Sequence, residues 1–230
     1  MTFQFSSIDQ EFSAQKPDVS PALSVTRKRS FYRQFVKHPL DVALTLLALP
    51  IVAPVVVVLA LLVMLDGHNP FYSQMRVGKN GRSFRMWKLR TMVPNADEML
   101  ESYLAEHPAA RLEWNATQKL KRDPRVTWLG FLLRKTSLDE LPQLWNVLNG
   151  TMSLVGPRPI MVNQRDAYTG HAYFNLRPGL TGAWQVSDRN NCDFIDRVRY
   201  DDLYDNDLSF RRDFGIMLET LRVVARGTGC

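Results

Sequence analysis

One continuous apolar stretch dominates the pattern of hydrophobic and polar positions along the chain. Every residue from 42 to 65 is apolar except Thr45. A straight helix of this length would reach about 36 Å, and the hydrocarbon core of a bilayer is about 30 Å thick. A helix in the core of a soluble domain is rarely so long and so uniformly apolar. The pattern therefore predicts that this segment lies in a membrane.

Two prolines near the middle of the run decide how it enters the membrane. Pro50 and Pro54 lack an amide hydrogen, so each frees the carbonyl group four residues earlier. Two prolines at this spacing can turn a helix sharply. Positive charge keeps a flank cytoplasmic, and both flanks carry it, in Arg27, Lys28, Arg29, Arg33 and Lys37 upstream and in Arg76, Lys79, Arg82, Arg85, Lys88 and Arg90 downstream.

These observations predict a re-entrant helix–break–helix. Its two arms, of about a dozen residues and about 18 Å each, would enter and leave on the cytoplasmic face. A kinked helix that crosses the bilayer is the alternative. The chain then divides into a flexible tail at 1–26, an interfacial and membrane segment at 27–66, and a cytoplasmic catalytic domain at 67–230.

The segment before the apolar run mixes cations with aromatic residues. Phe31 and Phe35 lie four residues apart, which places them on one face of a helix. Nucleic-acid-binding arms have a similar composition, but the adjoining apolar run favours an anionic membrane surface. The net charge of +6 and the pI of about 9.5 also indicate anionic partners. We therefore expect membrane lipids, and no nucleic acid, as partners of this segment.

The rest of the chain has the patterning of a mainly helical α+β domain with surface amphipathic helices. Strand-like stretches at 71–74 and 83–89 flank a glycine-containing turn at 78–81, which predicts a small β-hairpin. Thr127 is a candidate N-cap for a helix over 128–134. Further helices are predicted at 97–104, 109–120, 138–148, 197–203 and 214–224, with His107-Pro108 as a break between the first two.

Asp139 and Glu140 are the strongest candidates for chemistry. They lie near the start of the helix predicted at 138–148, and the apolar face of that helix includes Trp145. Ser137-x-x-Glu140 fits a capping box, in which Glu140 only binds a backbone amide. With Asp139 as the N-cap, Pro142 falls in the first turn, where it costs little. An ionised carboxylate beside a metal-held diphosphate can instead act as a nucleophile or a metal ligand. Capping and chemistry both stay open at this point.

Several basic segments could bind phosphate near these acids. Arg158 lies between two prolines, and a constrained guanidinium suits bidentate phosphate contact, although a structural ion pair would use the same residue. Arg177 precedes a glycine-rich turn that could approach a ligand closely. Lys88 and Arg90 alternate along a predicted strand, where a solvated cationic face is the simpler interpretation.

The motifs together carry a resemblance to a known family. They are Phe71-Tyr72-x-Gln74-x-Arg76-Val77-Gly78, Trp87-Lys88-Leu89-Arg90-Thr91-Met92, Arg134-Lys135-Thr136-Ser137-Leu138-Asp139-Glu140-Leu141-Pro142-Gln143, Met152-Ser153-Leu154-Val155-Gly156-Pro157-Arg158-Pro159 and Arg177-Pro178-Gly179-Leu180-Thr181-Gly182. In this order they resemble the bacterial sugar transferases, the monotopic polyprenyl-phosphate phosphoglycosyl transferases. The resemblance runs from about Asp41 to the C-terminus.

The resemblance implies a two-step reaction at the inner (cytoplasmic) membrane. Asp139 would attack the sugar-proximal phosphate of a UDP-sugar and expel UMP, and undecaprenyl phosphate would then take the phosphosugar. Glu140 would hold Mg²⁺ together with Asp139 or assist the acceptor. Similarity to rhizobial members of the family favours galactose-1-phosphate as the transferred group, in the first membrane step of exopolysaccharide synthesis. A homodimer is one assembly that the sequence leaves open.

The resemblance also implies a set of substrate-binding residues and a position for the membrane break. Arg134 would engage the polyprenol phosphate, and Pro157-Arg158-Pro159 would lie at the diphosphate. The full set is Lys88, Arg90, Arg134, Gln143, Pro157, Arg158, Arg177, Gly179 and Thr181. The break would fall at Ala53-Pro54, where the family has a serine whose hydroxyl satisfies a freed carbonyl; here Thr45 or a neighbouring segment would have to do so.

Two other functions are compatible with these residues. A metal-dependent glycosyltransferase would release UDP rather than UMP and would carry an Asp-x-Asp motif, whose spacing Asp205 and Asp207 have. A non-catalytic membrane adaptor would use the basic surface alone, and its paired acids would then be helix caps.

Overall fold

The computed structural model describes residues 30–117, 120–187 and 196–225. The predicted tail at 1–26 lies outside the described residues. The described chain is mainly helical with two two-stranded sheets, which confirms the α+β class. Its α-helices are α2 (Lys37–Val63), α3 (Ala96–Glu106), α4 (Pro108–Thr117), α5 (Trp128–Thr136), α6 (Leu144–Leu148), α7 (Ala172–Asn175), α8 (Ala183–Val186), α9 (Arg197–Asn206) and α10 (Phe210–Ala225).

The remaining elements are short. The strands are β1 (Phe71–Val77), β2 (Ser83–Leu89), β3 (Ser153–Val155) and β4 (Gly179–Thr181). A π-helical turn, η1 (Tyr32–Val36), precedes α2. The 3₁₀ turns are η2 (Met64–Asp66), η3 (Lys79–Gly81), η4 (Leu138–Gln143) and η5 (Val162–Gln164).

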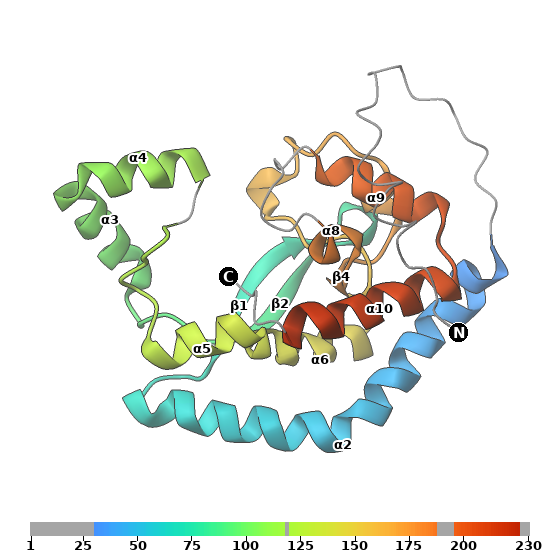
Figure 1. Cartoon of the computed structure of the whole chain (residues 1–230), viewed down its shortest axis with the longest axis horizontal. Helices are drawn as coiled ribbons and strands as arrows, with labels where there is room; N and C mark the ends of the chain where they lie inside the picture. The colour runs from blue at the N-terminus through green and yellow to red at the C-terminus, as the bar shows by residue number, and fades with distance from the viewer. Residues whose placement is uncertain (1–29, 118–119, 188–195, 226–230) are drawn as a thin grey trace, which may run out of the picture.

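The long apolar segment forms the single helix α2, which contains both Pro50 and Pro54. Figure 1 shows α2 bent near its middle, so the predicted break is a bend within a helix that continues. The Thr45 hydroxyl donates to the Asp41 carbonyl at 2.8 Å. The prolines free the carbonyls of Leu46 and Pro50, not that of Asp41. The expectation that the Thr45 hydroxyl binds a freed carbonyl was therefore wrong. By length and composition this helix could lie in a membrane or cross one.

The start of α2 is held to the C-terminal helices by buried acids. The Lys37 ammonium lies 2.6 Å from a carboxylate oxygen of Asp213, which also accepts a hydrogen bond from the Tyr32 hydroxyl at 2.8 Å. Arg33 pairs in the same way with Asp205. Two of the cations that the sequence assigned to the membrane flank are therefore bound to carboxylates of the protein. Asp205 serves this contact in α9, which argues against a metal-binding Asp-x-Asp motif there.

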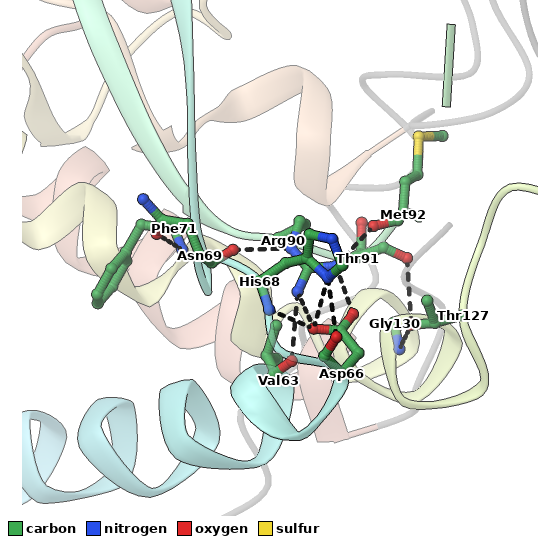
Figure 2. Close-up of polar contacts among 10 residues, drawn as sticks. All are labelled: Val63, Asp66, His68, Asn69, Phe71, Arg90, Thr91, Met92, Thr127 and Gly130. Atoms are coloured by element: carbon green, nitrogen blue, oxygen red, sulfur yellow. Dashed lines mark hydrogen bonds and ion pairs between the residues drawn. The ribbon is translucent and has the colours of Figure 1, made fainter. Parts of the chain in front are cut away.

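The end of α2 is held to β2 through Arg90. Its guanidinium donates to both carboxylate oxygens of Asp66 at 2.7 Å each, and to the carbonyls of Asn69 at 2.7 Å and Val63 at 3.3 Å (Figure 2). A bidentate guanidinium–carboxylate pair fixes orientation as well as distance. Arg90 thus connects the end of α2 to the strand that carries Lys88.

The predicted hairpin is present and is longer than expected at β1. β1 pairs with β2 in antiparallel register, with Tyr72 opposite Lys88. The other edge of β2 is bound by Asn146 of α6, whose side chain is almost fully buried. Its amide nitrogen donates to the Arg85 carbonyl at 2.8 Å, and its oxygen accepts from the Trp87 amide at 3.1 Å. The Asn146 side chain therefore makes the hydrogen bonds that a neighbouring strand would otherwise make with this edge of β2.

The segment expected to be one helix over 138–148 is two elements. Ser137 adopts a left-handed conformation (φ 57°) that ends α5, and η4 and α6 follow. Pro142 falls inside η4, between two backbone hydrogen bonds that do not use its nitrogen: the Glu140 amide donates to the Ser137 carbonyl, and the Leu144 amide donates to the Leu141 carbonyl. Trp145 was expected on the buried face but is 61% exposed. The 3₁₀ turns of η4 have three residues each instead of 3.6, so residues after η4 point in other directions than in a continuous α-helix.

Other predictions of helices hold with small changes of bounds. Thr127 caps α5, its hydroxyl oxygen accepting from the Gly130 amide at 2.9 Å. α3 and α4 are separate helices that meet at His107-Pro108, and Figure 1 shows them projecting from the rest of the fold. The helix predicted over 109–120 is helical to Thr117; residues 118–119 lie outside the described residues, and Leu120 is not helical. α9 and α10 are both longer than predicted.

A small parallel sheet, not predicted from the sequence, carries the two glycine-containing motifs. Ser153 of β3 pairs with Gly179 of β4, and Val155 pairs with Thr181. A Cβ atom at Gly179 would lie 2.1 Å from the Gly156 backbone nitrogen, so the two backbones can meet only as glycines. The sheet borders the largest core cluster, which includes Leu176, Trp184, Tyr204 and Ile216.

Candidate active site

Asp139 and Glu140 lie on η4, directly against β2. The Lys88 ammonium is 2.7 Å from a carboxylate oxygen of Glu140 and 3.4 Å from one of Asp139. Asp139 is only 6% exposed. The Asn146 contacts hold η4 and α6 along the β2 edge, so the acids meet the one lysine that β2 presents to them. The sequence analysis assigned Lys88 to substrate binding, and in the structure it is paired with both acids.

Two opposing effects act on the pKa of the Asp139 carboxyl group. Burial raises the pKa of its carboxyl group, and the neighbouring charge of Glu140 raises it further. The ammonium of Lys88, by charge and by hydrogen bond, and the guanidinium of Arg134 lower the pKa of Asp139. The net pKa lies above its ordinary value. The ionised form of Asp139, which a nucleophile needs, therefore depends on its two basic neighbours.

Arg134 reaches the site from the last turn of α5. Its Nε donates to the Thr91 hydroxyl at 2.9 Å, and this contact aims the guanidinium across the end of β2. The approach requires Gly130, because a Cβ atom there would lie 2.0 Å from the Thr91 carbonyl oxygen. Figure 2 shows Thr91, Thr127 and Gly130 gathered at this crossing. Arg134 thus lies near Asp139, as the resemblance implies.

The capping interpretations of the acid pair are both wrong. The Ser137 side chain makes no capping hydrogen bond, so there is no capping box. Asp139 is the second residue of η4 rather than its N-cap, and its carboxylate is paired with Lys88. Neither capping interpretation therefore accounts for the acids, and the burial of Asp139 beside cations needs another explanation.

A second group of cations lies beside the acid pair. An Arg158 Nη atom is 4.0 Å from a Glu140 carboxylate oxygen, and the Arg158 guanidinium lies 5.9 Å from the centre of the Trp184 ring. Arg197 stacks over the same ring at 4.1 Å. Burial and the charges of Arg158 and Arg197 lower the pKa of Arg76. Arg158 is thus next to Glu140, and Arg76 and Arg197 lie near Arg158.

Sequence reasoning found only Arg158 of this group as a candidate. Arg76 lay within a quoted motif and was counted only as a flanking cation. Arg197 belongs to a polar helix and to no recognised motif, and nothing in the sequence distinguishes Trp184 from an aromatic residue of the core. Each residue becomes informative only when the fold brings distant segments together.

Other predicted substrate-binding residues lie in different surroundings. Arg90 uses its guanidinium to hold Asp66. Arg177 Nε donates to the Gly150 carbonyl at 2.8 Å, and the Thr181 hydroxyl contacts that of Thr220 at 2.6 Å. These three side chains, and Gly179, have structural roles in the described chain. Gln143 is buried in η4, four residues after Asp139, and the Pro157 carbonyl accepts from the Gly179 amide at 2.8 Å.

The donors present suit a magnesium ion only in combination with a substrate. No group of three or more His, Cys, Asp or Glu side chains that could hold a metal occurs among the described residues. Mg²⁺ is commonly bound by one or two carboxylates, with substrate phosphates and waters completing the octahedron. Asp139 and Glu140 fit that pattern. The Lys88 ammonium lies between their oxygens and would have to share the space with the ion.

Comparison with known proteins identifies the family. The sequence profile of the family described as bacterial sugar transferase matches residues 32–227, which include α2 and the whole acid–cation site. The chain therefore belongs to the bacterial sugar transferase family.

Several characterised or named proteins are similar to the chain. The UDP-galactose-lipid carrier transferase of Erwinia amylovora is 44% identical over 198 residues, 85% of this chain and 42% of that protein. The undecaprenyl-phosphate galactose phosphotransferase of Salmonella typhimurium is 43% identical over the same shares of the two chains. The exopolysaccharide production protein ExoY of Sinorhizobium fredii is 43% identical over 196 residues, 84% of this chain and 87% of that protein. The chain thus spans less than half of the first two relatives.

The charge of Lys88 should keep Asp139 ionised. Lys88→Met removes a cation that lowers the pKa of the Asp139 carboxyl group, so this pKa should rise, whereas Lys88→Arg should leave it lower than in Lys88→Met. The measurement is an NMR titration of ¹³C-labelled aspartate in detergent, with the Asp139 signal identified from its loss in Asp139→Asn. An Asp139 titration that is the same in Lys88→Met and in the unaltered protein would contradict this account.

Proposed function

We propose that the protein transfers a sugar-1-phosphate from a UDP-sugar to undecaprenyl phosphate and releases UMP. The observation that supports this most directly is the buried Asp139 carboxylate, held between Lys88 and Arg134 with Glu140 and Arg158 alongside. A buried acid surrounded by cations suits a reaction in which a carboxylate meets a diphosphate.

In the first step an Asp139 carboxylate oxygen attacks the sugar-proximal phosphorus. The bond from that phosphorus to the bridging oxygen breaks, and UMP leaves with the bridging oxygen and the electron pair. Asp139 then carries the phosphosugar as an acyl phosphate. Arg158 and its neighbours Arg76 and Arg197 are placed to bind the diphosphate and the departing phosphate.

In the second step an oxygen of undecaprenyl phosphate attacks the same phosphorus. The bond to Asp139 breaks, its carboxylate is restored, and a lipid diphosphate sugar leaves. Arg134 reaches the site from α5, whose exposed residues include Trp128 and Phe131, and is placed to bind the phosphate of a lipid acceptor. Lys88 can balance whichever of the two acids is ionised at each stage.

Mg²⁺, bound by Asp139, Glu140 and the substrate phosphates, would neutralise charge on the diphosphate as UMP leaves. Glu140, paired with Lys88 at 2.7 Å, is the more accessible acid and the better placed to retain a cation while Asp139 reacts.

The transferred sugar is proposed to be galactose, as the first step of exopolysaccharide synthesis. The names of the Erwinia and Salmonella relatives refer to galactose, and that of the Sinorhizobium relative to exopolysaccharide production. The site would face the cytoplasm, where UDP-sugars are made, at the inner membrane. The outward face of α2 supports membrane insertion, since residues such as Leu47, Ile51 and Leu61 are largely exposed there.

The bend in α2 favours a re-entrant helix. Both of its ends are tied to the catalytic domain, through Lys37 to Asp213 and through Asp66 to Arg90. One folded domain cannot lie on both sides of a bilayer, so two tethered ends keep both on one side. This tethering is stronger support for re-entry than the proline pattern alone.

Asp139→Asn should abolish transfer. The amide cannot act as the nucleophile, and turnover of UDP-galactose with undecaprenyl phosphate should fall roughly a thousandfold or more. The assay scores UMP and UDP separately. Asp97→Asn, the same change on the exposed surface of α3, should leave UMP release unchanged. UDP as the product would favour a glycosyltransferase, and an active Asp139→Asn enzyme would falsify the nucleophile assignment.

Cysteine labelling should place both ends of α2 on one side of the membrane. Single cysteines at Phe31 and Asn69, in a background with Cys192 and Cys230 replaced by serine, should react with an impermeant maleimide only in inverted vesicles. Both sites flank the helix, and a cysteine at residue 69 keeps the backbone carbonyl that accepts from Arg90. Reaction of one cysteine in intact cells and of the other only in inverted vesicles would show that α2 crosses the bilayer.

A further inference from the structure

Basic side chains gather at the turn of the β-hairpin, at the opposite end from the acid pair. Arg177 Nε donates to the Gly150 carbonyl at 2.8 Å. His38, in the first turn of α2, meets the same glycine: its Nε2 lies 3.4 Å from where a Cβ of residue 150 would stand. Gly150 has a φ of +76°, so it also allows the sharp turn that brings these segments together.

Two further cations complete this group. Burial and the charges of Arg177 and Arg33 lower the pKa of Lys79, which lies on η3 at the hairpin turn. An Nη atom of Arg165 lies 3.0 Å from the Cβ position at Gly81 in the same turn. We refer to His38, Lys79, Arg165 and Arg177 as the turn cluster. It brings together residues of α2, η3, the segment after η5 and the segment before β4.

The turn cluster is not balanced by acids within the described chain. None of the ion pairs among described residues joins Lys79, Arg165 or Arg177 to a carboxylate. Asp41 is near His38, but its carboxylate accepts from Ser153 and faces Lys37. His38 Nδ1 is buried without a hydrogen-bond partner. Gathered cations without acids favour an added anion.

The turn cluster is separate from the catalytic site. Lys88 lies five residues after Ser83, which is next to the turn, and five residue steps span about 16 Å along a strand. Arg177 was predicted from its motif to bind substrate, but it lies in the turn cluster and its Nε donates to the Gly150 carbonyl.

We propose that the turn cluster binds the phosphate of an anionic lipid headgroup. His38 begins the arm of α2 that enters the membrane, and Phe31 and Phe35 just before it are 72% and 61% exposed. Arg33 is paired with Asp205, and Lys37 is paired with Asp213. Cations from other elements must therefore contact the lipid headgroups near the start of α2. The proposal rests on the membrane entry of α2 and not on the reaction at Asp139.

The test measures lipid retention by native mass spectrometry of the full chain in neutral detergent. Phosphatidylglycerol is added to the unaltered protein, to Lys79→Gln and to the matched control Arg122→Gln, an exposed cation between α4 and α5. Lys79→Gln should weaken binding of one phosphatidylglycerol about fivefold, the effect of losing one cation near an anionic lipid. Arg122→Gln and Asp139→Asn should bind as the unaltered protein does.

Three results would overturn the proposal. Equal losses in Lys79→Gln and Arg122→Gln would show a general effect of charge. The protein could retain phosphatidylcholine and phosphatidylglycerol equally, with neither amount changed by Lys79→Gln. That result would show that the cluster does not select anionic headgroups. Inorganic phosphate could raise the melting temperature of the unaltered protein but not that of Lys79→Gln, while phosphatidylglycerol changes neither. That result would assign the site to free phosphate. Because the Asp139→Asn protein is included, lipid binding is judged independently of catalysis.

Discussion

The hydrogen bonds of Asn146 to the free edge of β2 are the interaction on which the site depends. A buried side-chain amide binds the Arg85 carbonyl and the Trp87 amide, where a neighbouring strand would otherwise pair. Leaving those backbone groups unpaired in the interior would cost about 1–3 kcal/mol each. The contact therefore sets the position of η4 relative to β2, and with it the distance from Lys88 to the two acids.

The same strand also links the site to the membrane. Lys88 faces the acids, while Arg90, two residues later, holds the end of α2 through Asp66. At the other end of α2, Lys37 and Tyr32 hold Asp213 of α10. Helix α2 is thus attached to the rest of the described chain at both ends, and its two prolines lie between those attachments. A lipid acceptor that reaches the site from the bilayer would do so beside α5, where Arg134 is.

The elements that could be predicted from sequence are those fixed by neighbouring residues. The hairpin turn, the Thr127 cap and the His107-Pro108 break all follow from local chemistry, and all are present. The capping box at Ser137 failed because a left-handed residue ends α5 there, which pattern alone does not reveal. Arg90 and Arg177 were assigned to substrate because a motif shows that a cation is required but not which partner it has. Arg76, Arg197 and Trp184 depend on contacts between distant segments and had no local signal.

The central claim is that Asp139 forms a covalent bond to the phosphosugar, and mass spectrometry of the trapped enzyme tests it most directly. The enzyme is mixed with UDP-galactose without undecaprenyl phosphate, quenched in acid and digested. The account predicts one hexose-phosphate on the peptide that contains Asp139, in an amount equal to the UMP released. UMP release without any adduct, or an adduct on a different residue, would contradict it.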